Sequence, residues 1–129
     1  MAKRPRAGKP KTPRGDNLKE AVVLIPLTDN EGKPFSTETI EVICDEIFGT
    51  FRGWTIEGTV KGAYQMRSTG QKRVEELMKV SIVLAASQIA DLETMVGRWC
   101  ARLGQEVILL KIADLVVKFV PPQPEIEES

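Results

Sequence analysis

The residues best placed for acid–base chemistry are Glu76 and Tyr64, which the sequence pattern puts on facing arms of a predicted β-hairpin. Glu76 falls on the apolar parity of its segment, with Lys61 and Glu57 as polar neighbours across the hairpin. A carboxylate held at a half-buried position can have a raised pKa and act as a general base. The alternative is that Glu76 lies near a strand end and reaches water. We favour this alternative, and no catalytic residue is assigned.

The composition excludes several classes of active site. The chain has no histidine, which removes the usual general base near neutral pH, the nucleophile pairs that contain histidine and the zinc sites that contain histidine. Its two cysteines fall at apolar helical positions, so buried free thiols are favoured over a disulfide. No phosphate-binding glycine loop, nucleophile elbow or cluster of metal ligands occurs in the sequence. We therefore expect neither a cofactor nor a metal.

A long alternating segment from Trp54 to Met66 anchors the fold prediction. One parity carries bulky side chains at Trp54, Ile56, Val60, Tyr64 and Met66, interrupted by Gly58 and Gly62. This period of two predicts a half-buried strand. Small residues on such a strand permit the close approach of a helix or a ligand, or mark bulges that curve the sheet. Packing is favoured, and the alternative is a ligand pocket between this strand and the helices, formed by Gly58, Gly62, Tyr64 and Glu76.

The other elements complete a β-α-β-β-α-β order. Apolar runs predict strands at 21–27 and 107–112, and alternation predicts the returning hairpin arm at 74–84. Ser36 is placed to cap a helix that runs to about Phe51, and Ser87 is placed to cap a second helix that ends at Gly104. This order is typical of a ferredoxin-like α+β two-layer sandwich with an antiparallel sheet. The competitor has the same elements in another strand order, and residues 115–120 add a possible extra C-terminal strand.

The sheet face opposite the helices is expected to carry more large aliphatic residues than a monomer usually exposes. The residues assigned to this surface are Leu77, Val83, Val107 and Leu109. A second copy of the chain is the simplest cover, which predicts a homo-oligomer. The alternative is that residues 115–120 or the tail fold over this face.

Charge is distributed unevenly, although the chain has 18 basic and 18 acidic residues. Residues 1–19 form a basic arm that is predicted to be disordered, residues 20–120 form the α+β domain, and residues 121–129 form an acidic, flexible tail. The arm could bind nucleic acid or an acidic protein by charge neutralisation through Lys3, Arg4, Arg6, Lys9, Lys11 and Arg14. The first and third strands carry no aromatic residue, which disfavours an RNA-recognition motif.

These observations support two functional hypotheses. The first residues lack the apolar region of a secretory signal, and no uncharged run reaches membrane-spanning length, so a cytoplasmic protein without membrane contact is expected. The leading hypothesis is a small non-enzymatic interaction module that self-associates through its sheet and engages an acidic partner through its arm. The alternative hypothesis is a small-molecule-binding or catalytic module that uses the predicted glycine-lined pocket.

Overall fold

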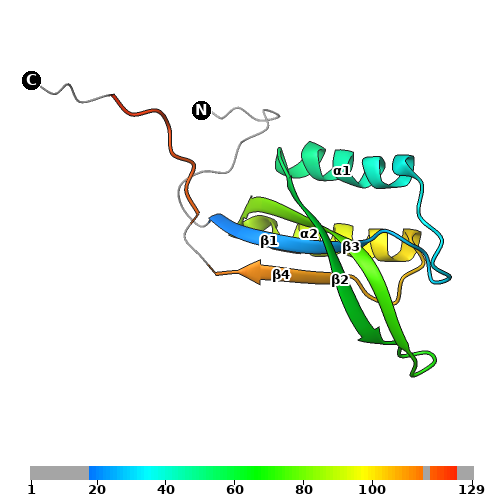
Figure 1. Ribbon diagram of the computed structural model, residues 1–129. Coiled ribbons are helices and arrows are strands. Elements are labelled where there is room, and N and C mark those ends of the chain that lie inside the picture. The colour runs from blue at the N-terminus through cyan, green and yellow to red at the C-terminus, as the bar shows by residue number, and fades with distance from the viewer. Residues whose placement is uncertain (1–17, 115–116, 125–129) are drawn as a thin grey trace, which may run out of the picture.

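The sheet of this protein has four antiparallel strands in the spatial order β2-β3-β1-β4 (Figure 1). The computed structural model describes residues 18–114 and 117–124. The strands are β1 (Leu18–Pro26), β2 (Thr55–Gln65), β3 (Lys72–Ala85) and β4 (Leu109–Ala113), and the helices are α1 (Thr37–Phe51) and α2 (Ile89–Arg102). Both helices contribute to one core against the sheet. The predicted α+β class and the antiparallel sheet are therefore confirmed.

The predicted basic arm and the predicted acidic tail both lie partly outside the described residues. Strand β1 begins at Leu18, inside the segment that was assigned to the arm. Residues 117–124 form no strand, so the possible extra C-terminal strand is not found in that range. Residues 1–17, 115–116 and 125–129 lie outside the description, and with them the six basic residues predicted to bind a partner and most of the acidic tail.

The two helices begin in different ways. Helix α1 follows the predicted cap, because the Ser36 side chain accepts a hydrogen bond of 3.1 Å from the backbone N–H of Thr39. The prediction that Ser87 caps α2 is wrong. A short 3₁₀ turn at Ala86–Gln88 precedes this helix, and the Gln88 side chain accepts the N–H of Ala85 at 2.9 Å. The hydrogen bond expected from Ser87 is thus replaced by one that Gln88, the next residue, accepts from the backbone N–H of Ala85.

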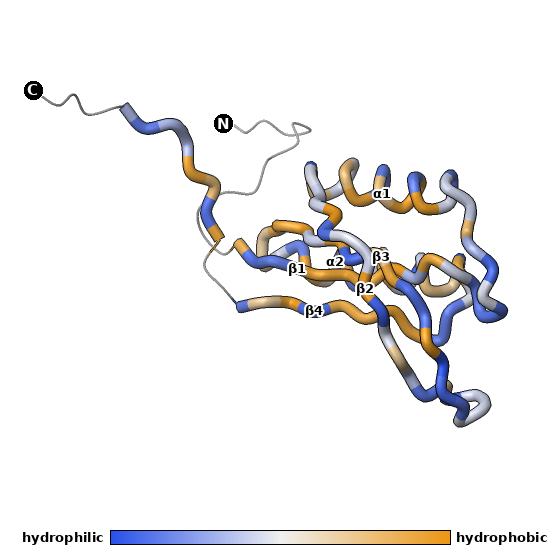
Figure 2. The backbone as a smooth tube through the Cα atoms, in the orientation of Figure 1, coloured by the Kyte–Doolittle hydropathy of each residue, from blue (hydrophilic) through white to orange (hydrophobic). Residues whose placement is uncertain are grey.

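The hydrophobic core lies between the sheet and the helices. Figure 2 shows apolar segments along β1, β3 and the inward positions of both helices. Trp99 is completely buried, and its indole N–H donates a 2.7 Å hydrogen bond to Glu46, which ties α2 to α1. The strand residues buried in this core are Ala21, Val23, Ile25, Met78, Val80, Ile82 and Leu84.

Strand β2 changes faces at a β-bulge. Ile56 pairs with Val80 on the helix-covered face, whereas Gly58 pairs with Lys79 on the opposite face, because Glu57 is an extra residue in the ladder. Gly58 has φ +115°, a conformation that other residues rarely adopt. The single apolar row predicted from Trp54 to Met66 is therefore divided between two faces. We call the face opposite the helices the open face.

Candidate functional site

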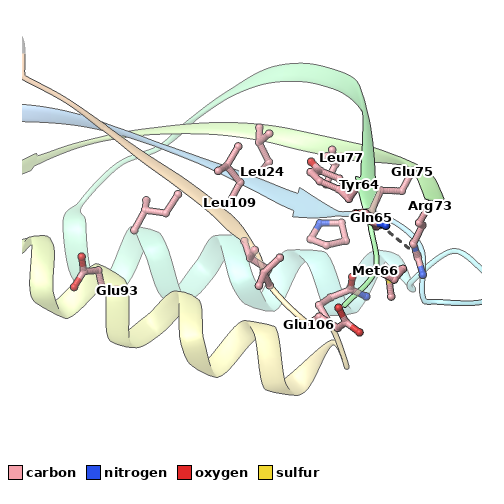
Figure 3. A pocket seen from close by; sticks show the side chains of 15 residues that line it. Leu24, Tyr64, Gln65, Met66, Arg73, Glu75, Leu77, Glu93, Glu106 and Leu109 are labelled. Atoms are coloured by element: carbon pink, nitrogen blue, oxygen red, sulfur yellow. Dashed lines mark ion pairs between the residues drawn. The ribbon is translucent and has the colours of Figure 1, made fainter. Parts of the chain in front are cut away.

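A pocket of about 520 Å³ lies on the open face, next to β1 and between the β2–β3 hairpin and β4 (Figure 3). Its apolar floor is formed by Leu24, Pro26, Leu77, Val107 and Leu109. The polar residues that line it include Tyr64, Arg73, Glu75, Gln105 and Glu106. A volume of this size is in the range of small-molecule sites, which are mostly apolar with a few placed polar groups.

The hairpin supplies one wall of this pocket because it is longer than the sheet it belongs to. Strand β1 pairs with β3 only as far as Leu77, whereas β2 and β3 pair as far as Gln65 and Lys72. Beyond Leu77 the two strands therefore form a two-stranded ribbon that leaves the sheet (Figure 1). Strand β4 and the loop before it supply the opposite wall.

A buried ion pair between Glu75 and Arg73 lies in the wall formed by the ribbon. Their side chains are only 9% and 14% exposed, and Glu75 Oε1 lies 3.2 Å from Arg73 Nη2 (Figure 3). This distance is that of an ion pair, but Oε1 accepts no hydrogen bond from the described residues. The carboxylate is thus compensated in charge while its capacity to accept a hydrogen bond is unused.

Arg73 is held in place by the loop between β1 and α1. Its guanidinium donates to the Asn30 side chain at 2.7 Å and to the backbone carbonyl of Asp29. The amide of Asn30 in turn donates a 3.0 Å hydrogen bond to the carbonyl of Gly104. These contacts connect the ribbon to the loop that precedes β4. The two walls of the pocket are therefore linked through Arg73, Asn30 and Gly104.

Tyr64 lies over Gly62 and beside Leu77 in the same wall (Figure 3). Burial and, to a smaller extent, the negative charge of Glu75 raise the pKa of Tyr64 above its usual value. The phenol therefore stays protonated at neutral pH and can donate a hydrogen bond. The pocket combines this donor, the Glu75 acceptor and an apolar floor.

The predicted pocket residues are only partly brought together. Tyr64 lines the pocket and Gly62 lies under its ring, but the pocket is on the open face and not between β2 and the helices. Gly58 lies at the bulge and is not part of the lining, and Glu76 is exposed on the other side of the ribbon. The buried carboxylate is that of the neighbouring Glu75.

Glu76 reaches water, which agrees with the favoured prediction and not with the alternative pocket. The pocket hypothesis assumed that the apolar parity of this arm is buried along its whole length. The ribbon extends beyond the helices, however, so that even Val74 on that parity is 54% exposed. One signal could have identified Glu75: the parity that Arg73 and Glu75 share is mostly polar, but Leu77 and Val83 interrupt it with aliphatic side chains.

The residues predicted for self-association lie on or beside the open face. Leu109 and Val107 are 44% and 57% exposed, and Val83 is half-buried. Leu77 is only 3% exposed, because the ribbon and Tyr64 already cover it. Leu77 is therefore part of the monomer's own packing.

Cys44 and Cys100 are free thiols, as predicted, and burial raises the pKa of both. Within residues 18–114 and 117–124, no three acidic or thiol side chains are grouped as metal ligands. No helix in these ranges has the length and apolar character needed to cross a bilayer.

The solved structures that are similar to this chain include a phage SAM lyase and a DUF3240 family protein. A phage SAM lyase in complex with S-methyl-5′-thioadenosine has a TM-score of 0.63 at 15% identity, over 78% of this chain and 84% of that chain. A DUF3240 family protein from Shewanella baltica OS155 has a TM-score of 0.56 at 16% identity, over 84% of this chain and 100% of that chain. At such identities the likeness shows the fold alone. Neither a protein-family model nor a curated protein sequence matches the chain.

Proposed function

We propose that this domain binds a small molecule with an apolar body and a cationic or hydrogen-bond-donating group in the open-face pocket. The observation that carries this proposal is the Glu75 carboxylate, which is 9% exposed and has an oxygen without a hydrogen-bond donor. A buried acceptor without a donor costs free energy. Glu75 lines the pocket, so a ligand that donates to its carboxylate offsets this cost once it displaces the contacts that bury Oε1. The apolar floor contributes the burial of the ligand's remaining surface.

The charges around the pocket favour a cationic ligand. The described residues that line the pocket include three carboxylates, those of Glu75, Glu93 and Glu106, and one guanidinium, that of Arg73. The lining therefore carries more negative than positive groups. The Tyr64 ring adds an aromatic face, and such faces attract cations.

The structurally similar lyase suggests a first probe of this chemistry. That protein is described as a SAM lyase and contains S-methyl-5′-thioadenosine. S-adenosylmethionine carries a positively charged sulfonium and an amino-acid chain on a nucleoside, whereas S-methyl-5′-thioadenosine is a neutral thioether that lacks both. Comparing the two probes separates the contribution of the nucleoside from that of the sulfonium and its amino-acid chain taken together.

Calorimetric titration of the full chain with both probes tests the proposal. We expect S-adenosylmethionine to bind more tightly than the thioether, and the change Glu75→Gln to weaken its binding about tenfold or more, because a hydrogen bond to a charged group is lost. The matched control is Glu76→Gln, which alters an exposed carboxylate on the other side of the ribbon. Mass spectrometry of the incubated probe detects any turnover. Failure of both probes to bind, or equal effects of the two variants, contradicts the proposal.

Self-association through the open face is a second candidate function. The exposed Val107 and Leu109 favour it, since no described element covers them. Lys79 and Lys111 lie on this face together with Glu20, so the surface carries both charge signs and can complement a second copy of itself.

Light scattering at micromolar concentration tests self-association. We expect a mass above the 14.3 kDa of one chain, and its reduction to that mass in Leu109→Lys. The control Val74→Lys changes a similarly exposed residue on the other side of the ribbon. A monodisperse monomer for the unmodified chain overturns this candidate.

We further propose that the domain is a ferredoxin-like sandwich. The β-α-β-β-α-β element order and the strand order β4-β1-β3-β2, with β1 and β3 central, support this assignment. Cytoplasmic location stays a prediction.

Binding of nucleic acid or an acidic protein by the arm also stays a prediction, because its basic residues lie outside the described ranges. Replacing those six residues by Gln should abolish salt-sensitive binding to DNA or RNA. Unchanged affinity for DNA or RNA would show that the arm does not contribute to this binding.

A further inference from the structure

The tip of the β2–β3 hairpin, residues 66–71, is held against the loop before β4 by one carboxylate. Glu106 Oε1 accepts the backbone N–H of Arg67 at 3.0 Å, and Oε2 accepts the N–H of Ser68 at 3.1 Å. Met66 at the tip and Val107 in the loop both line the pocket. Glu106 therefore joins the two walls of the pocket at the end where Met66 lies (Figure 3).

The tip is hydrogen-bonded within itself. Met66 N–H donates to the carbonyl of Gln71 at 2.8 Å, and Gly70 N–H donates to the carbonyl of Met66 at 2.8 Å. The Gln65 side chain donates to the carbonyl of Gly70 at 3.1 Å. These bonds let the tip move as one unit when its contact with the loop is broken.

The two attachments of the ribbon differ in strength. In the second-last pair of the ladder, just before the tip, Arg73 is largely buried and is bonded to the β1–α1 loop. At its tip, Glu106 is exposed, so water competes for the hydrogen bonds that it accepts. A two-stranded ribbon has little stability of its own. The contact at the tip is therefore the one that opens first.

We infer that residues 66–71 are a lid on the open-face pocket and that Glu106 is its latch. This inference rests on the proposed ligand-binding function. Glu106 is a positioning residue: it acts through the backbone amides of Arg67 and Ser68 and thereby holds Met66 over the pocket, beside Tyr64. A ligand enters when the latch is open, and closure of the lid slows its release.

Hydrogen exchange and chemical modification of the full chain test the lid without any ligand. In Glu106→Ala, we expect the amides of Arg67 and Ser68 to exchange about tenfold faster, while β1 amides are unchanged. The chain contains one tyrosine, so nitration by tetranitromethane reports access to Tyr64 specifically, and we expect it to be several-fold faster.

Two further variants separate the latch from a general effect of charge. Glu106→Gln keeps one acceptor oxygen and should fall between the unmodified chain and Glu106→Ala. Glu93→Gln removes another carboxylate that lines the pocket, but one that makes no hydrogen bond to the tip, and it should change neither rate. Unchanged exchange at the tip or unchanged nitration in Glu106→Ala overturns the inference.

The outcomes distinguish the lid from the proposed function. If S-adenosylmethionine binds, Glu106→Ala should raise both its association and dissociation rates, whereas Glu75→Gln should raise mainly the dissociation rate. If neither probe binds the unmodified chain, the exchange and nitration rates still decide whether Glu106 holds the lid. Faster binding and release in Glu106→Ala together with an unaffected Glu75→Gln supports the lid and overturns the role of Glu75.

Discussion

The phenol of Tyr64 occupies the space that a side chain at Gly62 would need. A Cβ atom built at Gly62 would lie 2.5 Å from the Tyr64 hydroxyl oxygen and 2.9 Å from Leu77 Cδ1. The glycine thus lets the aromatic ring lie back along its own strand and against the floor of the pocket. One of the two glycines in β2 serves packing directly, and the pocket depends on that packing.

Gly62→Ala should therefore displace the Tyr64 ring. We expect the free energy of unfolding to fall by about 1–2 kcal/mol, as is usual when a packed site receives an extra carbon. Chemical denaturation measures this change, and the aromatic signals of the only tyrosine report the displacement. Gly97→Ala in α2 is the control, because nothing lies within 4 Å of a Cβ there. That variant should be stabilised by up to about 1 kcal/mol, since alanine favours helix. A loss of stability equal to that of Gly62→Ala would contradict the steric argument.

Removing the cation from the buried ion pair should lower the free energy of unfolding. In Arg73→Met, the largely buried Glu75 carboxylate loses its nearby positive charge and the ribbon loses its bonds to the β1–α1 loop. We expect a destabilisation of about 3 kcal/mol. The double variant Arg73→Met/Glu75→Leu should recover most of this loss, because no buried charge remains.

The half-exposed pair between Lys79 and Glu57 offers a control for that measurement. Its atoms lie 3.3 Å apart and both side chains are 35% exposed. Lys79→Met should cost less than about 1 kcal/mol. Equal losses in Arg73→Met and Lys79→Met in urea denaturation would show that burial of the Arg73 pair has no energetic consequence.

The bulge in β2 should depend on Gly58. Its φ of +115° is strained for any residue with a Cβ atom, so Gly58→Ala should lower the free energy of unfolding by about 1 kcal/mol or more. Gly53→Ala provides the comparison, since no positive φ and no close atom restrict that position. Thermal unfolding of the two variants measures the difference. An equal midpoint for both would exclude a conformational requirement at Gly58.

Acid should open the lid. The Ser68 side chain and the Arg67 amide hold the pKa of Glu106 below its usual value of 4.5. A carboxyl whose pKa is lowered by folding stabilises the folded state at every pH above its usual, unfolded-state pKa. This stabilisation is lost as the pH falls through the lowered, folded-state pKa. The tip should stay closed from neutral pH down to about 4.5 and open only in more acidic solution. The amide chemical shifts of Arg67 and Ser68 report this transition, which Glu106→Gln should abolish.

The carboxyl of Asp29 should titrate in a similar pH range, so its protonation must be followed separately. Hydrogen bonds from the amides of Lys33 and Glu31 lower the pKa of Asp29. Protonation of Asp29, which weakens these hydrogen bonds, should therefore also occur below the usual pKa of 3.8. Shifts at Lys33 and Glu31 that persist in Glu106→Gln would identify this second transition.

Local signals made much of the fold predictable, whereas the site depended on long-range geometry. The Ser36 cap and the apolar spacing up to Phe51 lie within one helix, so the sequence was sufficient to locate α1. The position of Glu75 was missed because burial of the ribbon is decided by Tyr64 and by β4, which comes more than thirty residues later. The bulge could not be located either, since both glycines share one parity and only the register distinguishes Gly58.

Because of the change of faces at Gly58, the large side chains before and after the bulge in β2 contact different parts of the molecule. Before the bulge, Ile56 lies on the helix-covered face, and after it Val60, Gly62 and Tyr64 lie on the open face, where Tyr64 lines the pocket. No β2 residue belongs to the core between the sheet and the helices. Apart from Gly62, which must stay small for Tyr64, the pocket-facing side chains after the bulge can therefore change separately from that core.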